Sequence, residues 1–155
     1  YELARGLSAF TATNQKQYWP AKKCSINMLA RQYSMGNLSV SDLDPKEFVV
    51  GYWFCKFNKE ATIRDAYFAQ KRIVTTANQA GRKMSSRIIM PRQGVPASLK
   101  EYDFALAYIH KNMEDWGANV DDHFSSARNT ENQKEADKIF SCDSSVVYTG
   151  KVVRN

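Results

Sequence analysis

The order of hydrophobic and polar positions predicts a chain built mostly of helices. Between residues 20 and 36, apolar side chains recur at the i, i+3, i+4 and i+7 spacing of one helix face, and Gly36 marks an end. The residues of this stripe are Ile26, Leu29, Ala30 and Tyr33. Residues 48–57 are apolar on nearly all sides, which predicts a helix in the centre of the core. The preceding Asp44, Pro45 and Glu47 are typical of a helix start.

A third helix is predicted over residues 60–83. Its inward stripe consists of Ile63, Ala66, Tyr67, Val74 and Ala77, and Gly81 marks its C-terminal end. Pro91 and Pro96 then bracket an irregular turn, and Ser98 with Glu101 forms a capping box that opens a fourth helix. The inward positions of the fourth helix are Ala105, Leu106, Ile109, Met113 and Trp116, and it ends at Gly117.

The remaining pattern completes an all-α fold with a compact helical core. Residues 131–140 predict a short last helix, and residues 144–155 predict an extended tail. We therefore expect an N-terminal arm over 1–17, a helical core domain over 18–140 and a C-terminal arm over 141–155. A chain of 155 residues is long enough to bury one core. No apolar run approaches the roughly 18 residues that span a bilayer, so we expect no membrane partner.

The composition of the chain points to reduced cysteines and to a polyanionic partner. Cys24, Cys55 and Cys142 are odd in number and far apart, which argues against a disulfide framework or a zinc site. Reduced thiols in a cytosolic setting fit this pattern better, and we expect neither metal nor cofactor. The net charge is +6, from 22 basic and 16 acidic residues, which favours a polyanion as partner.

Motifs for catalysis are weak, so we expect no enzyme. His110 and His123 are the only histidines. Asp122 adjoins His123, but adjacent residues on a helix point to different faces. A small hydrolase that uses His123 and Asp122 stays a distant alternative, and His110 is more typical of a helix flank than of a catalytic site.

Basic clusters interleaved with aromatic residues indicate binding of single-stranded nucleic acid. The clusters read QKQYWPAKK, RDAYFAQKR, GRKMSSRIIMPR and GKVVRN. Lysine and arginine neutralise phosphates, and aromatic rings stack on bases. The alternative for any one cluster is a solvated basic face whose aromatic residues belong to the core. Arg64 is the most informative residue, because a guanidinium beside an apolar stripe usually has a fixed anionic partner.

Five short motifs follow one another along most of the chain, namely TATNQKQYW, VVGYWFCKFN, ATIRDAYFA, MPRQG and KIFSCDSSV. In sequence and in order they resemble motifs of the coat proteins of flexible filamentous plant viruses. The chain resembles the potyvirus type of this family as a divergent member. The resemblance implies an α-helical subunit whose two arms clasp neighbours in a helical filament. It also implies a groove that encapsidates single-stranded genomic RNA without sequence preference, in the virion and the host cytoplasm.

The resemblance also assigns residues to the RNA groove. In the family a serine, an arginine and an aspartate line the pocket. Arg64 corresponds to the arginine, Asp103 or His110 to the aspartate, and Thr62 stands in for the serine. The basic patch of Lys83, Arg87 and Arg92 is expected to face the phosphates, with Arg64 and Asp103 as a charge pair. The alternative function is a monomeric, basic, helical regulator that binds RNA or DNA.

Overall fold

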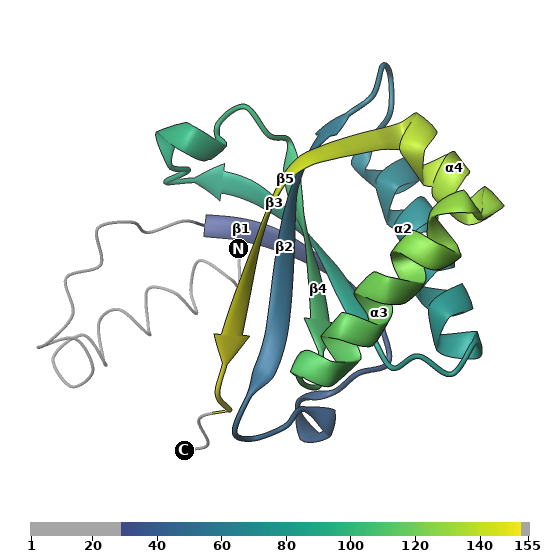
Figure 1. Cartoon of the computed structure of the whole chain (residues 1–155). Helices are drawn as coiled ribbons and strands as arrows, with labels where there is room; N and C mark the ends of the chain where they lie inside the picture. Colours follow the sequence, from purple (N-terminus) through teal and green to yellow (C-terminus); the bar gives the residue numbers. More distant parts are fainter. Residues whose placement is uncertain (1–28, 153–155) are drawn as a thin grey trace, which may run out of the picture.

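The computed structural model describes residues 29–152, which form a five-stranded antiparallel sheet with three α-helices on one side of it (Figure 1). The strands are β1 (Leu29–Gly36), β2 (Phe48–Phe57), β3 (Ser85–Gln93), β4 (Phe104–His110) and β5 (Phe140–Gly150). The α-helices are α2 (Ile63–Gln79), α3 (Met113–Ser125) and α4 (Glu131–Ile139). Three short 3-10 helices, η1 (Val40–Asp42), η2 (Ala97–Leu99) and η3 (Ala127–Asn129), lie in the connections.

The strand order β1-β3-β4-β2-β5 gives the sheet a known topology. From β2 onward the chain runs strand, helix, strand, strand, helices, strand, and β4 lies between β2 and β3. This is the ferredoxin-like split β-α-β arrangement, with β1 added beside β3. The connection through α2 and the connection through α3 and α4 therefore cover the same face of the sheet. Such a topology hosts many unrelated functions, so function has to be argued from a site.

The expected all-α fold is wrong, and residues 48–57 show why. This segment is apolar nearly all round because it is β2, which lies between β4 and β5. Val49 and Cys55 are fully buried under the helices, while Val50, Tyr52 and Phe54 line the opposite face. A strand that is apolar on both faces lacks the alternation of a half-buried strand, and length alone separates it poorly from a buried helix.

Two other predicted helices are also strands. The stripe around Leu29 and Tyr33 lies in β1, which pairs with β3. The stripe from Ala105 to Trp116 spans two elements, because β4 ends at His110 and α3 begins at Met113. Asn112 separates the two elements, since its side-chain oxygen accepts a hydrogen bond from the Asp115 backbone N–H at 2.8 Å and caps α3. The expected capping box at Ser98 is absent from η2, whose cap at Pro96 has no side-chain hydrogen bond.

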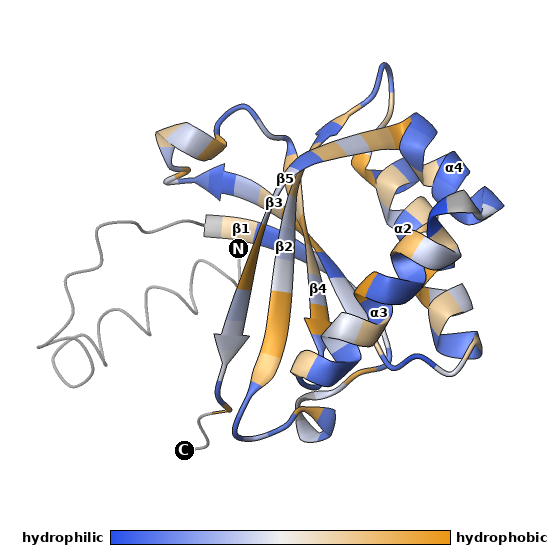
Figure 2. Cartoon of the chain, viewed as in Figure 1, coloured by the Kyte–Doolittle hydropathy of each residue, from blue (hydrophilic) through white to orange (hydrophobic). Residues whose placement is uncertain are grey.

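The predicted helices over 60–83 and 131–140 are confirmed as α2 and α4. Thr62 begins α2 with a capping box to Asp65. The helix ends at Gln79, and Gly81 then adopts a φ of +85°, which a glycine takes without strain. The core lies between these helices and the sheet, and its largest buried side chains include Phe104, Ile88 and Leu106. Figure 2 shows hydrophobic residues along the central strands and hydrophilic residues on the outer surface of the helices.

The C-terminal segment belongs to the sheet. Residues 141–150, which we expected to form part of an arm, lie in β5 and pair with β2 along nearly its full length. The N-terminal arm expected over 1–17 lies outside the described residues. No helix within residues 29–152 is long and apolar enough to cross a membrane.

A disulfide joins Cys55 of β2 to Cys142 of β5, so the expectation of reduced thiols is wrong for these two residues. The two cysteines are 87 positions apart in the chain, yet they face each other in the register of the neighbouring strands. Cysteine spacing along a sequence cannot reveal such a pair, because strand register alone brings the residues together.

Candidate ligand-binding site

Helix α3 faces the sheet without packing closely on it. Trp116, Asn119, Val120 and His123 follow the i, i+3, i+4 and i+7 spacing, so they share the face that looks towards the sheet. None of the thirteen residues of α3 is buried, whereas α2 buries five. An inward face that stays unburied indicates open space between α3 and the strands.

That space is a cavity of about 530 Å³. Its floor comes from β2 and β4, with Trp53, Leu106, Tyr108 and His110. Its walls come from α2, α3 and the junction of α4 with β5, with Gln70, Ile73, Ala77, Trp116, Val120, Phe124, Phe140 and Cys142 among the lining residues. Half of the lining residues are polar, and they include Asn119 of α3 and Gln133 of α4. A cavity of this volume that combines aromatic surface with several polar groups is typical of small-molecule sites.

Gly51 allows the indole of Trp53 to lie along the floor. Both residues point to the helix side of β2, and a Cβ atom at position 51 would lie 2.4 Å from the Trp53 ring. Any other residue at 51 would displace the indole. The ring packs edge-on against Tyr108 of β4, with 4.9 Å between the ring centroids. Two neighbouring strands therefore provide one continuous aromatic surface.

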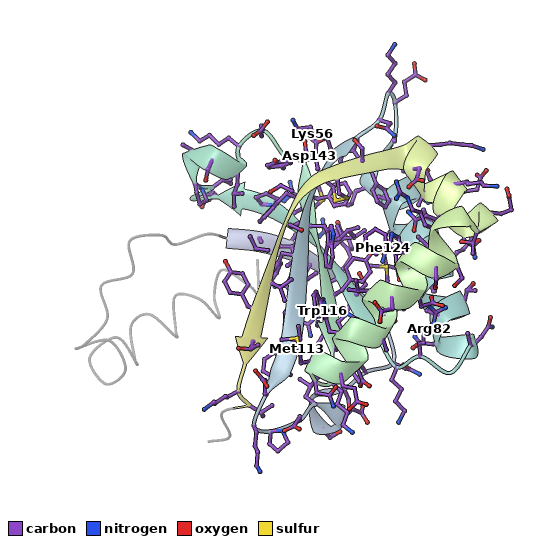
Figure 3. All side chains as sticks on the ribbon, in the orientation of Figure 1. Lys56, Arg82, Met113, Trp116, Phe124 and Asp143 are labelled. Atoms are coloured by element: carbon purple, nitrogen blue, oxygen red, sulfur yellow. A yellow bond between two sulfur atoms is a disulfide. The ribbon has the colours of Figure 1, made fainter. Side chains whose placement is uncertain are left out.

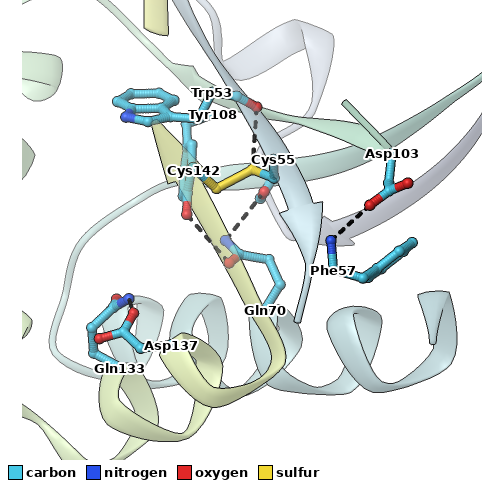
Figure 4. The surroundings of a disulfide bond; sticks show 10 residues. Trp53, Cys55, Phe57, Gln70, Asp103, Tyr108, Gln133, Asp137 and Cys142 are labelled. Atoms are coloured by element: carbon cyan, nitrogen blue, oxygen red, sulfur yellow. Dashed lines mark hydrogen bonds between the residues drawn. A yellow bond between two sulfur atoms is a disulfide. The ribbon is translucent and has the colours of Figure 1, made fainter. Parts of the chain in front are cut away.

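A buried polar relay joins α2 to the floor of the cavity (Figure 4). The Tyr108 hydroxyl donates to Gln70 Oε1 at 3.2 Å, and Gln70 Nε2 donates to Ser86 Oγ at 3.3 Å. Gln70 and Ser86 are fully buried. Burial raises the pKa of Tyr108 to about 12, so its hydroxyl keeps its proton and donates in this relay. The relay satisfies these polar groups and fixes the position of the Tyr108 ring.

His110 is buried and neutral at the end of β4. It is 3% exposed, and burial lowers its pKa to about 4, although Asp115 opposes this shift. Asn119 Nδ2 lies 3.4 Å from His110 Nδ1 and also donates to the Asp115 carbonyl at 2.8 Å. Because Nδ1 of the neutral ring accepts from Asn119, the proton resides on Nε2. Within residues 29–152, Nε2 has no hydrogen-bond partner, so it can donate to a guest.

Trp116 provides a second donor without a partner. Its Nε1 is buried, and it is the one such side-chain nitrogen or oxygen in the described part of the chain that makes no hydrogen bond. Trp116 lies on α3 towards the sheet (Figure 3) and lines the cavity. A buried N–H without an acceptor is costly, and native proteins contain few of them. An acceptor atom placed in the cavity would satisfy it.

The charged groups of the cavity lining are largely paired. Arg82 forms an ion pair with Asp122 of α3, and Asp122 also accepts from Ser126 at 2.7 Å. Burial, followed by the charge of Arg128, lowers the pKa of His123, so this ring also favours its neutral form. Phe124 lines the cavity but is 67% exposed, which places an apolar ring at its rim. The alternative of an Asp122–His123 catalytic pair gains no support, because Asp122 already binds Arg82 and Ser126.

Three residues that sequence reasoning placed in an RNA groove have local structural roles. Thr62 is the N-cap of α2. Arg64 is exposed on the first turn of α2, with its guanidinium 5.8 Å from the centre of the Phe68 ring. Asp103 accepts a hydrogen bond from the Phe57 backbone N–H at 2.8 Å, and so fixes the end of β2 (Figure 4). No ion pair joins Arg64 to Asp103, although both residues are described.

The other predicted site residues lie apart from one another. Lys83 is exposed between α2 and β3, and Arg92 is exposed near the end of β3. Arg87 is exposed opposite Ala107, on the face of the sheet without helices, where it donates to Gln32 at 3.4 Å. His110 lies on the helix-covered face and is the one residue predicted for the RNA groove that lines the cavity. His123, named for the alternative catalytic pair, lines the cavity as well.

The cavity could be anticipated from only one pattern in the sequence. Trp116, Asn119 and His123 share a helix face in which polar residues interrupt the apolar stripe, and a polar inward position signals a site more often than a core. Trp53 gave no such signal, because a tryptophan within an apolar run is typical of any core. Comparisons with protein-family models, curated proteins and solved structures found no match to this chain.

Proposed function

We propose that this domain binds a small, mostly apolar molecule that carries a hydrogen-bond acceptor, in the cavity between α3 and the sheet. The observation that carries the proposal is the buried Trp116 N–H, which lacks a partner among residues 29–152 and lines a cavity of about 530 Å³. His110 Nε2 offers a second donor nearby in the same lining. Two donors in an apolar site favour a carbonyl, ether or similar oxygen.

The charges of the site favour a neutral guest. The two histidines of the lining have lowered pKa values, and Arg82 is paired with Asp122. The remaining charge of the lining, Asp137, is exposed and accepts a hydrogen bond from Gln133 at 2.8 Å. Burying an ionised guest away from a free counter-charge would be costly. Binding without turnover is the simpler function, because a neutral His110 with a pKa of about 4 is a weak base and its ring contacts no hydroxyl or thiol of the described residues.

Encapsidation of RNA stays a prediction from the resemblance. It presupposed a helical subunit, whereas the described residues form a sheet with helices on one face. The charge that favoured a polyanion also lies mostly outside the described part: residues 29–152 hold 17 basic and 15 acidic residues of the chain's 22 and 16. The cavity therefore supports a small-molecule ligand better than the described surface supports a polyanion.

Titration with 1-aminoanthracene, a neutral fluorophore that brightens in apolar surroundings, tests the proposal. We expect saturable binding at one site per chain. Val120→Trp should weaken it, because Val120 lines the cavity and the larger side chain takes up part of the space that the probe would occupy. Val146→Trp is the matched control, because Val146 is 37% exposed on β5 and its replacement leaves the cavity open. Equal binding by both variants would place the probe elsewhere and contradict the proposal.

A pair of competitors tests the donors directly. The compounds 2-acetylnaphthalene and 2-ethylnaphthalene have similar shape, but only the ketone has an acceptor oxygen. The ketone should bind the wild type more tightly, and Trp116→Phe should reduce that preference by about tenfold, the worth of one hydrogen bond near 1.4 kcal/mol. If the variant weakens both compounds equally, Trp116 contributes only ring contact, and the acceptor is not part of the recognition.

A further inference from the structure

Strand β5 forms an open edge of the sheet. It pairs with β2 on one side, and no strand within residues 29–152 pairs with its other side. All residues from Asp143 to Thr149 are exposed. The outer backbone N–H and C=O groups of this strand are therefore free to pair with another chain, which native edge strands usually prevent. Figure 1 shows β5 along the outside of the sheet, opposite the β1 edge.

The sequence of β5 carries few of the usual protections. Residues 144–150 read SSVVYTG, without a charge or a proline. Val146, Val147 and Tyr148 are 37, 41 and 59% exposed. At the other edge, β1 exposes Arg31, Gln32 and Ser34 instead. Long, apolar, uncharged edges favour β-sheet extension by a second strand, whereas polar edges such as β1 do not.

The ends of this segment make it complementary to itself. Asp143 is the extra residue at the register shift between Cys142 and Ser144, and Lys151 follows the last residue of the strand. In an antiparallel pair of two β5 strands centred on Val147, Asp143 comes opposite Lys151 of the second copy, and Val146 opposite its Tyr148. A two-fold axis repeats each contact, so opposite charges meet at both ends. Parallel pairing in register would instead bring like charges together.

We propose that β5 pairs antiparallel with β5 of a second copy of this chain, about a two-fold axis at Val147. The two sheets then form one continuous sheet of ten strands, with the helices of both copies on the same side. The contact uses backbone hydrogen bonds along the edge, apolar contact between Val146 and Tyr148, and the two charge pairs. It leaves the cavity open, so ligand binding and dimer formation are separate properties.

Cross-linking tests the position of the axis in the full chain with Cys24→Ser. Directly opposed residues of an antiparallel pair lie about 4.5–5.5 Å apart between Cα atoms, within reach of a disulfide. Val147→Cys should therefore give a covalent dimer on mild oxidation. Ser145→Cys is the matched control, because its two copies would lie about 13 Å apart and should not cross-link. Equal cross-linking of both variants, or none of Val147→Cys, would overturn the proposed register.

Sedimentation velocity over a wide range of protein concentration tests the dimer itself. The wild type should dimerise. Asp143→Lys and Lys151→Asp should each weaken the dimer by tenfold or more, and the double exchange should restore it. Ser34→Lys on β1 should have no effect. A wild-type monomer at all concentrations, as expected if residues 1–28 of the same chain cover β5, would overturn the proposal. So would a double exchange that fails to restore the dimer. Binding of 1-aminoanthracene should be unchanged in all these variants.

Discussion

Helices α2 and α3 lie on the same face of one sheet, but they meet it in different ways. Three of the five buried residues of α2 are alanines, namely Ala66, Ala69 and Ala77. The inward positions of α3 are instead large or polar, as at Trp116, Asn119 and His123. Small side chains let α2 approach the strands closely, and bulky ones hold α3 away from them. Both helices are amphipathic, so a stripe shows which face points inward but not whether the space beneath is filled.

The close-packed core beneath α2 and the cavity beneath α3 should differ most in how much stability is lost when a side chain is truncated. Phe104, 1% exposed, packs against Phe57 and Phe140 with ring centroids 4.8 and 5.5 Å away. Phe104→Ala should lower the free energy of unfolding by about 3–5 kcal/mol. Val120 of α3 borders the cavity, so its side chain has few packing partners to lose. Val120→Ala should therefore lower the free energy of unfolding by less than about 1 kcal/mol. Urea denaturation measures both, and equal costs would mean that α3 is packed as closely as α2.

The disulfide lies between the core and the cavity. Breaking it should cause the next largest loss of stability. Cys55 belongs to the core, while Cys142 also lines the cavity. Replacing both by alanine should cost about 4 kcal/mol, because the bond closes a loop across 87 positions. Reductant should destabilise the wild type by a similar amount. Cys24→Ser should keep that sensitivity, and a wild type that is indifferent to reductant would show that the bond contributes nothing.

The buried His110, which lines the cavity, should make the stability of the fold sensitive to acid. The folded pKa of His110 is about 4, against an ordinary 6.5, so the folded state binds fewer protons than the unfolded state. The neutral ring contributes about 3 kcal/mol of stability in total. This contribution is complete above pH 6.5 and is lost as the pH falls towards 4.

His110→Gln should flatten the stability curve over that range, when unfolding is followed by urea titration at successive pH values. The pKa of His123 is also lowered, so His123→Gln should flatten the curve as well, and this variant serves as the comparison. Asp115 faces His110 and contributes a smaller opposing effect, which Asp115→Asn isolates. An unchanged slope in His110→Gln would show that folding does not shift the pKa of this ring.

The smallest expected effect has opposite signs for stability and for binding. Trp116→Phe removes an N–H that is buried without a partner among the described residues, so the ligand-free protein should gain up to about 1 kcal/mol in stability. The same variant should lose preference for the ketone over the hydrocarbon. Trp53→Phe is the comparison on the floor, where the indole packs against Tyr108 and its loss should only destabilise. A Trp116→Phe variant that is less stable would mean that packing of the indole outweighs its unpaired N–H.

Local signals in the sequence predict two of the helices correctly. The strands depend on contacts between segments far apart in the chain, which local patterns do not reveal. Both α2 and α4 were predictable because each begins at a threonine cap and carries a clear polar face. The sequence of β2, an interior strand of the sheet, predicts a helix because both of its faces are apolar. Asn112 was a readable signal for the start of α3, since an asparagine followed by Glu114 and Asp115 is typical of an N-cap. Within the site, the sequence marks His110 and His123 as candidate site residues, and Leu106 and Trp116 only as inward positions. It does not predict the cavity, because the cavity depends on how far α3 stands from the sheet.

A crystal pressurised with xenon would test most directly whether the α3 side is hollow and the α2 side is filled. Xenon occupies apolar cavities that contain no close-packed atoms. We predict xenon between α3 and the sheet, beside Trp53, Leu106 and Trp116, and none beneath Ala66 and Ala69 of α2. Absence of xenon beside Trp116, or an equal site beneath α2, would contradict the claim that the space under α3 is a ligand cavity.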